Sequence, residues 1–495
     1  RWMSPERPAP VEVEDPEALF QVALDHAMEQ APNANSFFMR VPYSRSYSPY
    51  IFVNWNETDE EGKRSFGRAS LLPDGSLVPE GRDTGGGQAL YRMHWAFHYI
   101  PASIGEIIAG IAAVFMFAAI ISGIITHKKI FIDFFTLRFG KGQRSWLDSH
   151  NVISVMSLPY QIMITFSGIL FVASTFFIPI YLAQYIGTPN LVETVVEDFT
   201  SNSSAGVRTG VAAELTDIGP LLAEAQKYLG DEPVSTITVH NPGDEAARIN
   251  IRGSIEGNVV RDTPGVWFNG VTGEVEKYAP REFTGAETVS DVFLGLHEAL
   301  FAGPILRVLF FVSGLMGCAM IATGLVLWTK KRRQKLRADA KAERNLIIIE
   351  RMNVGVIAGL SIAVAAYFWG NRLLPLELAG RAEWEMHTLF LVWLVMIIHS
   401  LARPPQKAWT EQLCLAAFMY AFIPVLNALT TDLHLGNTLP LPGRSGNFAL
   451  AGVDLWLLAI GLGFAYAARI SMKKASKVAK RPKRKANSAS PVPAE

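Results

Sequence analysis

Histidines stand at the ends of the long apolar runs of this sequence. His94 and His98 lie in "ALYRMHWAFHYIP", just before one run, and His297 lies in "VFLGLHEALFAGP", just before another. A proline follows His94 and His297 at the same spacing, at Pro101 and Pro304. Polar side chains at the edge of a bilayer are costly and are usually paired or functional. These histidines are therefore candidate ligands of a buried group.

Haem binding is one chemistry that requires such side chains, because haem iron takes axial histidines. His94 and His98 are four residues apart, so we expect them to share one helix face, with one as the ligand and the other as its hydrogen-bonding neighbour. The proline spacing shared with His297 favours His94 as the ligand. The alternative is a belt of interfacial histidines among aromatic side chains, with no ligand role.

A second pair of histidines lies at the opposite ends of the neighbouring runs. His127 ends one run in "SGIITHKK", and His150 begins the next in "RSWLDSHNV", so a connecting hairpin can bring them together. His98 and His127 are separated by about 43 Å of helix at 1.5 Å per residue, too far to share one haem. The sequence predicts an outer and an inner site, and with them a route for electrons across the membrane.

Other polar residues in these runs have simpler interpretations. Ser122-Gly123 and Thr323-Gly324 occupy similar positions near the inner ends of two runs, where small residues permit close helix packing or leave room for a flat macrocycle. Packing is the simpler interpretation. The weaker histidine candidates are His387, His399 and His434. The acidic residues interpreted as loop or helix-end groups, rather than a proton path, are Glu377, Asp432 and Asp454.

The elements that position these histidines are membrane helices. Of the 495 residues, 49% are hydrophobic and only 18% are charged, a balance that soluble domains rarely show. Runs long enough to cross a hydrocarbon core of roughly 30 Å occur at 104–126, 152–182, 303–329, 346–369, 386–402, 411–430 and 451–470. We predict a mainly α, polytopic membrane protein with a bundle of seven transmembrane helices.

Charge sorting predicts the orientation of this bundle. Lys and Arg crowd after the first, third and last runs, which makes those segments cytoplasmic by the positive-inside rule. Residues 1–100 and 183–300 then lie on the outer face, and the C-terminus is cytoplasmic. Because the chain begins outside without a signal peptide, we expect a further membrane helix upstream. The basic tail is interpreted as an anchor for anionic lipid, with no nucleic-acid partner.

The two outer segments have the same order of patterns. Residues 16–80 contain a helical pattern and then the alternating segments "SFFMRVP", "PYIFVNW" and "RSFGRASLL"; residues 215–278 repeat this order with "STITVHNP", "AARINIRG" and "GVWFNGVTGEVEKY". We predict two small α+β periplasmic modules that arose by duplication. The predicted division is module 1 at 1–90, two transmembrane helices with a cytoplasmic hairpin at 91–182, module 2 at 183–292, a transmembrane helix at 293–335, a four-helix transmembrane segment at 346–470, and a disordered cytoplasmic tail at 471–495.

Nucleotide and metal-cluster motifs are missing from the sequence. No GxxxxGK[ST] loop occurs, and no GxGxxG follows a predicted strand, so no nicotinamide or flavin module is visible. Cys318 and Cys414 both fall inside apolar runs and form no CxxC. Any electron donor must therefore be a separate molecule.

These features resemble the PepSY-associated transmembrane family, which includes iron-regulated inner-membrane proteins and haem-containing ferric-siderophore reductases. The resemblance covers roughly residues 1–335 and is carried by the repeated modules, the histidine-marked helix starts, "SGIITHKKIFIDFFTLR", "RSWLDSHNV" and "SLPYQIMITFSGIL". It implies haem-iron ligands at His94, His150 and His297, with His98 and His127 as further candidates. Related members often read Phe-His where this chain reads Tyr160-Gln161.

The resemblance also implies a function. The protein is expected in the bacterial cytoplasmic membrane, with two haem b groups, reducing Fe(III) held by a siderophore on the periplasmic side with electrons from an external donor. Two alternatives stay open at this point. One is a permease for a siderophore or iron without redox chemistry, and the other is a PepSY-type regulatory binding protein. The resemblance gives no role to residues 346–470.

Overall fold

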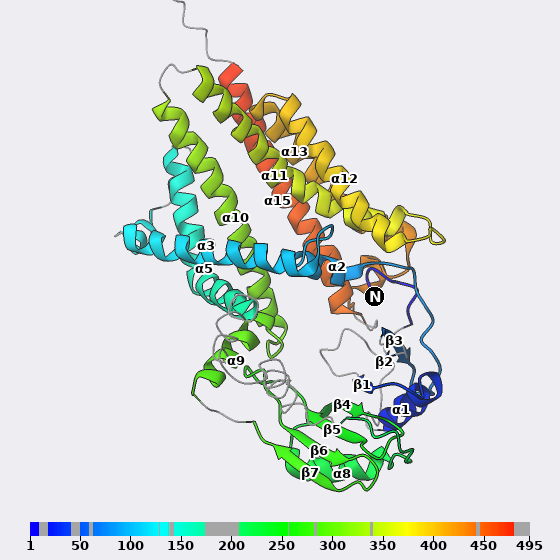
Figure 1. Cartoon of the computed structure of the whole chain (residues 1–495). Coiled ribbons are helices and arrows are strands. Elements are labelled where there is room, and N and C mark those ends of the chain that lie inside the picture. Colours follow the sequence, from blue (N-terminus) through cyan, green and yellow to red (C-terminus); the bar gives the residue numbers. More distant parts are fainter. Residues whose placement is uncertain are drawn as a thin grey trace, which may run out of the picture.

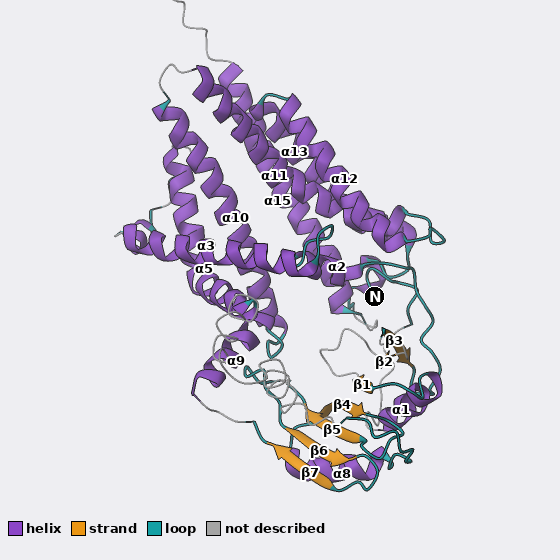
Figure 2. Ribbon diagram, viewed as in Figure 1, coloured by secondary structure: helices purple, strands orange, loops and turns teal. Residues whose placement is uncertain are grey.

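The computed structural model describes residues 1–8, 18–40, 50–58, 63–127, 129–136, 138, 143–173, 207–255, 257–281, 285–336, 340–441 and 446–479. A bundle of long helices occupies one end of the molecule, and a single β-sheet with two helices occupies the other (Figures 1 and 2). The tail predicted at 471–495 begins as helix, because the last long helix continues to Ala479. Residues 480–495 and the chain between 174 and 206 lie outside the described residues.

Seven helices in the described part of the chain are long and apolar enough to cross a membrane. They are α3 (Ala102–Thr126), α5 (Gln143–Phe171), α10 (Pro304–Lys335), α11 (Ala340–Leu373), α12 (Arg381–Ala402), α13 (Pro405–Thr430) and α15 (Phe448–Ala479). The predicted class, a mainly α polytopic membrane protein, is confirmed.

The long helices form two groups. α5 packs along α10, while α11, α12, α13 and α15 pack together as a four-helix segment that touches α10 through α11. α3 contacts α5, and in Figure 1 it runs across α5 instead of alongside it. Four shorter helices flank the long ones: α2 (Gly86–Met93), α4 (Ile130–Asp133), α9 (Gly285–Glu298) and α14 (Leu435–Thr438).

The predicted outer modules are joined in one seven-stranded antiparallel sheet. The strands are β1 (Ser36–Arg40), β2 (Ile51–Thr58), β3 (Arg64–Leu71), β4 (Val234–His240), β5 (Arg248–Gly253), β6 (Gly265–Asn269) and β7 (Val275–Ala279), and their order in the sheet is β3-β2-β1-β4-β5-β6-β7. The two modules meet where β1 pairs with β4, with Phe38 opposite Thr238. Equivalent strands that pair antiparallel in this way are related by an approximate twofold axis.

Alternating apolar residues give the sheet one buried face. Phe37 and Met39 of β1 and Ile237 and Val239 of β4 are fully buried, and the residues between them are not. This period of two is what a strand buried on one face requires. The helices α1 (Ala18–Gln30) and α8 (Ile218–Leu229) cover that face, and residues of both modules contribute to one common core.

The two ends of the helix bundle differ in charge. The sheet lies at the end where α10 begins, whereas the basic residues at the C-terminal end of α10, among them Arg332, Arg333 and Lys335, lie at the opposite end (Figure 1). α15 ends at that same basic end. The described fold therefore separates the sheet from the basic ends as the charge pattern predicts, and the assignment of these ends to periplasm and cytoplasm stays a prediction.

Candidate functional site

The helix that was expected to carry both His94 and His98 is broken between them. α2 ends at Met93, His94 caps it, and α3 begins only after Pro101. Phe97 has φ +50°, a left-handed conformation that a helix cannot continue through. The expectation of one shared helix face is therefore wrong, and the two imidazoles face different partners.

His94 and His297 form the outer pair. Their ring centroids are 6.1 Å apart, with 45° between the ring planes. Two metal–nitrogen bonds of about 2 Å each, plus the ring radii, separate the rings of a bis-histidine metal site by about 6 Å. α9, which carries His297, is also followed by a left-handed residue, Ala299 with φ +52°. The spacing of the outer pair fits axial coordination of one iron.

Ser167 of α5 fixes the tautomer of His297. Its Oγ lies 2.8 Å from His297 Nδ1 and donates its own hydrogen to the Met163 carbonyl, 2.7 Å away. Because that hydrogen is already used, Ser167 Oγ accepts from His297 Nδ1–H. The neutral ring then keeps its free lone pair on Nε2, which is the atom a metal requires.

Burial keeps His297 neutral. Loss of solvation, and after it the nearby His94 ring, lowers the pKa of His297 to about 4, so the imidazole carries no proton on Nε2 at neutral pH. Phe171 packs edge-on against the same ring, with centroids 5.1 Å apart. A Cβ at Gly168 would lie 3.5 Å from His297 Cε1, so a larger side chain there would occupy the space beside the ring.

The support of His150 has the same construction as that of His297. His150 of α5 lies with Nδ1 3.0 Å from Thr323 Oγ1 of α10, and that hydroxyl donates to the Ala319 carbonyl at 2.7 Å. A Cβ at Gly324 would lie 3.4 Å from His150 Cε1. His127 caps the C-terminal end of α3. His150 is thus held with Nε2 free, like His297.

The two sites are reciprocal across the α5–α10 pair. Ser167-Gly168 of α5 supports His297 of α9. Thr323-Gly324 of α10 supports His150 of α5 in the same way. Sequence reasoning singled out Thr323-Gly324 but missed Ser167-Gly168. The signal was present, because "TFSGIL" and "IATGLV" both set a hydroxyl residue before a glycine. Ser122-Gly123 differs, since a Cβ at Gly123 would meet nothing within 4 Å.

His98 lies apart from the outer pair. Its Nε2 is 3.0 Å from Glu383 Oε2 of α12, and its ring stacks on Phe390 with centroids 6.0 Å apart. The adjacent Tyr99 hydroxyl is 2.7 Å from His387 Nδ1. Of the two histidines in the opening stretch, the structure brings only His94 to His297.

The outer pair of imidazoles is a candidate set of ligands for a haem. Within the residues that the structure describes, no three His, Cys, Asp or Glu side chains are grouped to hold a metal ion. A porphyrin supplies four equatorial ligands itself and needs only axial ones from the protein. Paired imidazoles beside apolar and aromatic side chains match that requirement.

A protein-family model described as the PepSY-associated TM region matches residues 1–331. The chain belongs to this family. It is also similar to an uncharacterized protein of Pseudomonas aeruginosa, with 23% identity over 310 residues that cover 61% of this chain and 76% of the relative. Both candidate sites lie within the part of this PepSY-associated protein that the family model matches, and the whole four-helix segment lies beyond it.

Gln161 marks where this PepSY-associated chain departs from the Phe-His pattern. It is buried at 3% exposure and donates from Nε2 to the Ser313 carbonyl of α10 at 3.1 Å. A Cβ at Gly317 would lie only 2.6 Å from the same Nε2, so Gln161 fills the space that this glycine leaves. The residue therefore joins α5 to α10 between the two sites.

The remaining polar candidates of the sequence lie in the four-helix segment. Glu377 and Asp432 are exposed, as expected for loop groups. Asp454 is not: its side chain is fully buried and accepts from Trp2 Nε1 at 2.9 Å and from Asn427 Nδ2 at 3.1 Å. Its interpretation as an interfacial group is wrong, because the N-terminal residues of the chain fold over it. His399 contacts Glu411 at 2.9 Å, and His434 caps α14.

Proposed function

We propose that this protein transfers electrons through two haem groups across the bacterial cytoplasmic membrane and reduces ferric siderophores on the periplasmic side. The observation that carries the proposal is the shared construction around His297 and His150. In each case a hydroxyl with its hydrogen already donated accepts from Nδ1 and leaves Nε2 free. Structural histidines of a core have no need of such a device at both ends of one helix pair.

Haem bound at these sites would supply one-electron transfer to Fe(III), which siderophore oxygen donors hold more tightly than Fe(II). The residues of this chain hold the ligands. Ser167 and Thr323 fix the tautomers, Gly168 and Gly324 leave space beside the rings, and burial keeps His297 unprotonated. His94 would complete the outer site and His127 the inner one.

A substrate site is available next to α9. A cavity of about 510 Å³ lies between the end of β7 and the first half of α9, and its lining includes Lys277, Tyr278, Ser290 and Asp291. This volume is in the range of small-molecule sites, about 300–1,000 Å³. Asp291 precedes His297 on α9 by about 9 Å at 1.5 Å per residue. A ferric complex in this cavity would lie on the same short helix as an outer ligand.

The visible spectrum of the protein, purified from cells supplied with haem, tests the proposal. We expect a Soret band corresponding to two haems per chain. His297→Ala and His94→Ala should each remove one haem, His150→Ala should remove the other, and His98→Ala should keep both. A protein without a Soret band would refute the proposal. Accumulation of a siderophore in vesicles without spectral change would point instead to a permease.

A further inference from the structure

The four-helix segment α11–α13 and α15 contacts the part of the chain that carries His94. α2 and the residues up to 100 run beside α12, and contacts at both ends of this stretch join it to α12. Residues 86–100 are called the α2 stretch below.

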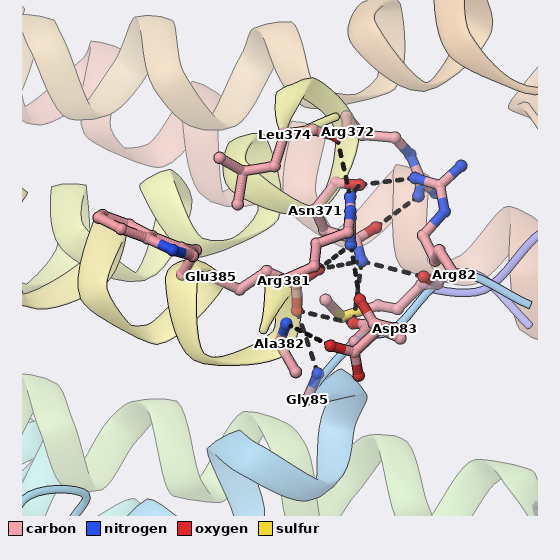
Figure 3. A network of polar contacts seen from close by, with 12 residues as sticks. Arg82, Asp83, Gly85, Asn371, Arg372, Leu374, Arg381, Ala382 and Glu385 are labelled. Atoms are coloured by element: carbon pink, nitrogen blue, oxygen red, sulfur yellow. Dashed lines mark hydrogen bonds and ion pairs between the residues drawn. The ribbon is translucent and has the colours of Figure 1, made fainter. Parts of the chain in front are cut away.

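The first contact point is the start of α2. The Glu385 carboxylate of α12 accepts from Thr84 Oγ1 at 2.7 Å and from the Gly85 backbone N–H at 3.2 Å (Figure 3). Tyr367 of α11 donates to the Gly86 carbonyl at 2.8 Å. A carboxylate at the N-terminal amides of a helix also complements the helix dipole. The N-terminus of α2 is thereby fixed to two helices of the segment.

Glu385 is itself held rigidly. Arg381 and Glu385 are both fully buried and 2.6 Å apart, and Asn371 Nδ2 donates to Glu385 at 2.8 Å. Arg381 also donates to the Asp83 carbonyl at 2.9 Å (Figure 3). The network therefore joins α12 to the loop that precedes α2. Both terminal nitrogens of Arg381 have partners, and only its Nε has none among the described residues. Moving either member of the pair would leave a buried charge unpaired, which restricts the pair to few arrangements.

Apolar packing joins the middle of α2 to the same helices. One side of α2 packs against a buried cluster of α11 and α12. The α2 residues in this contact are Ala89, Leu90 and Met93, and the cluster contains Tyr367, Met386 and Leu389.

The second contact point lies just past His94. His98 contacts Glu383 at 3.0 Å, and the Tyr99 hydroxyl lies 2.7 Å from His387 Nδ1. Glu383 and His387 flank Glu385 on α12, so all of these contacts come from one helix.

We propose that the four-helix segment positions His94, holding the α2 stretch at both ends so that the imidazole faces His297 at the distance that axial coordination needs. Glu385, Tyr367, Glu383 and His387 are positioning residues, since none of them contacts His297 or the supporting Ser167. The inference rests on the proposed function for the identity of the bound group. It assigns a role to the part of the chain that lies beyond the family match.

Variants of the contact residues test this inference and leave both members of the buried Arg381–Glu385 pair in place, although Thr84→Val takes one hydrogen bond from Glu385. Thr84→Val with Tyr367→Phe removes hydrogen bonds at the first contact point, and Tyr99→Phe removes one at the second. The matched controls are Thr388→Val, a threonine of α12 that bonds only its own helix, and Tyr420→Phe, a buried tyrosine stacked on Phe464.

Hydrogen exchange on the haem-free protein provides the first measurement. We expect the α2 amides to exchange about tenfold faster when the anchoring hydrogen bonds are lost. Exchange in β4 and β5 should not change, and the controls should behave like the wild type. The triple variant combines Thr84→Val, Tyr367→Phe and Tyr99→Phe. Unchanged exchange of the α2 amides in this variant would overturn the inference.

The haem-loaded protein provides the second measurement. The electron paramagnetic resonance signal and midpoint potential of the outer haem should shift in the triple variant, while those of the inner haem stay constant. Faster α2 exchange with an unchanged outer haem would overturn the positioning role. A wild-type protein that binds no haem would refute the proposed function and the ligand role of His94 with it, while the exchange result would still decide whether α12 holds α2.

Discussion

Ser167→Ala should weaken haem binding at the outer site. The substitution removes the hydroxyl that accepts from His297 Nδ1–H at 2.8 Å and leaves the rest of α5 unchanged. Loss of a partner that orients a ligating histidine typically costs 10–100-fold in affinity. The Ile164 carbonyl, which Ser167 Oγ contacts at 3.2 Å, loses the same hydroxyl and can take over part of the bond to the ring. We therefore expect the lower end of this range, about tenfold, or about 1.4 kcal/mol.

Titration of the haem-free protein with haem, followed at the Soret band, measures this effect. The His150→Ala background isolates the outer site. Ser157→Ala is the matched control, because Ser157 is buried on the same helix and donates to the Ile153 carbonyl at 2.9 Å. Equal haem affinity in Ser167→Ala and Ser157→Ala would refute the tautomer argument. A similar large loss of haem affinity in both variants would show that the two serines act only by stabilising the helix.

Other variants probe the inner site, the helix pair and the sheet. Gly324→Ala should retain the inner haem, because the new Cβ is in ordinary contact with His150, whereas Gly324→Leu should lose it in the same titration. Gly317→Ala should lower the stability of the α5–α10 pair by about 1–3 kcal/mol through overpacking, and Gln161→Ala should rescue it in a thermal melt, a non-additive result. Asp244 accepts from three backbone N–H groups, which lower its pKa from 3.8 to about 2, so the stability it contributes is present above pH 4 and is lost as the pH falls toward 2. Asp244→Asn should remove this dependence of stability on pH. The measurement is the rate at which pepsin cleaves the full-length protein within residues 207–281 between pH 4 and pH 2.

Much of the fold is readable from local patterns. The apolar runs and the alternating segments are long and regular, so the membrane helices and most strands follow from residue periods alone. Two features do not follow from residue periods. One is the division of "GVWFNGVTGEVEKY" into β6 and β7, and the other is the pairing of β1 with β4. That pairing depends on which edges meet in space, and nothing in the sequence of either module specifies a partner for its edge strand.

The candidate site is readable only in part. His94, His297 and His150 can be selected by their positions, because an imidazole at the end of an apolar run is rare enough to stand out. The break at Phe97 could not be foreseen, since a left-handed phenylalanine is set by the packing around it and not by its own preference. The burial of Asp454 could not be foreseen either, because its cover, Trp2, is 452 residues away along the chain.

The shared sheet also bears on how such a protein arises. A single module would leave the long edge of β1 or β4 unpaired, and an exposed edge of this kind pairs with another copy of itself. The β1–β4 contact has the form of a twofold dimer interface within one chain, as the predicted duplication would produce. His94 and His297 each follow one of the two modules along the chain, and their rings meet. The fusion of two copies frees each half to change alone, so one histidine can gain a support such as Ser167 while the other comes under the control of a newly attached helical segment.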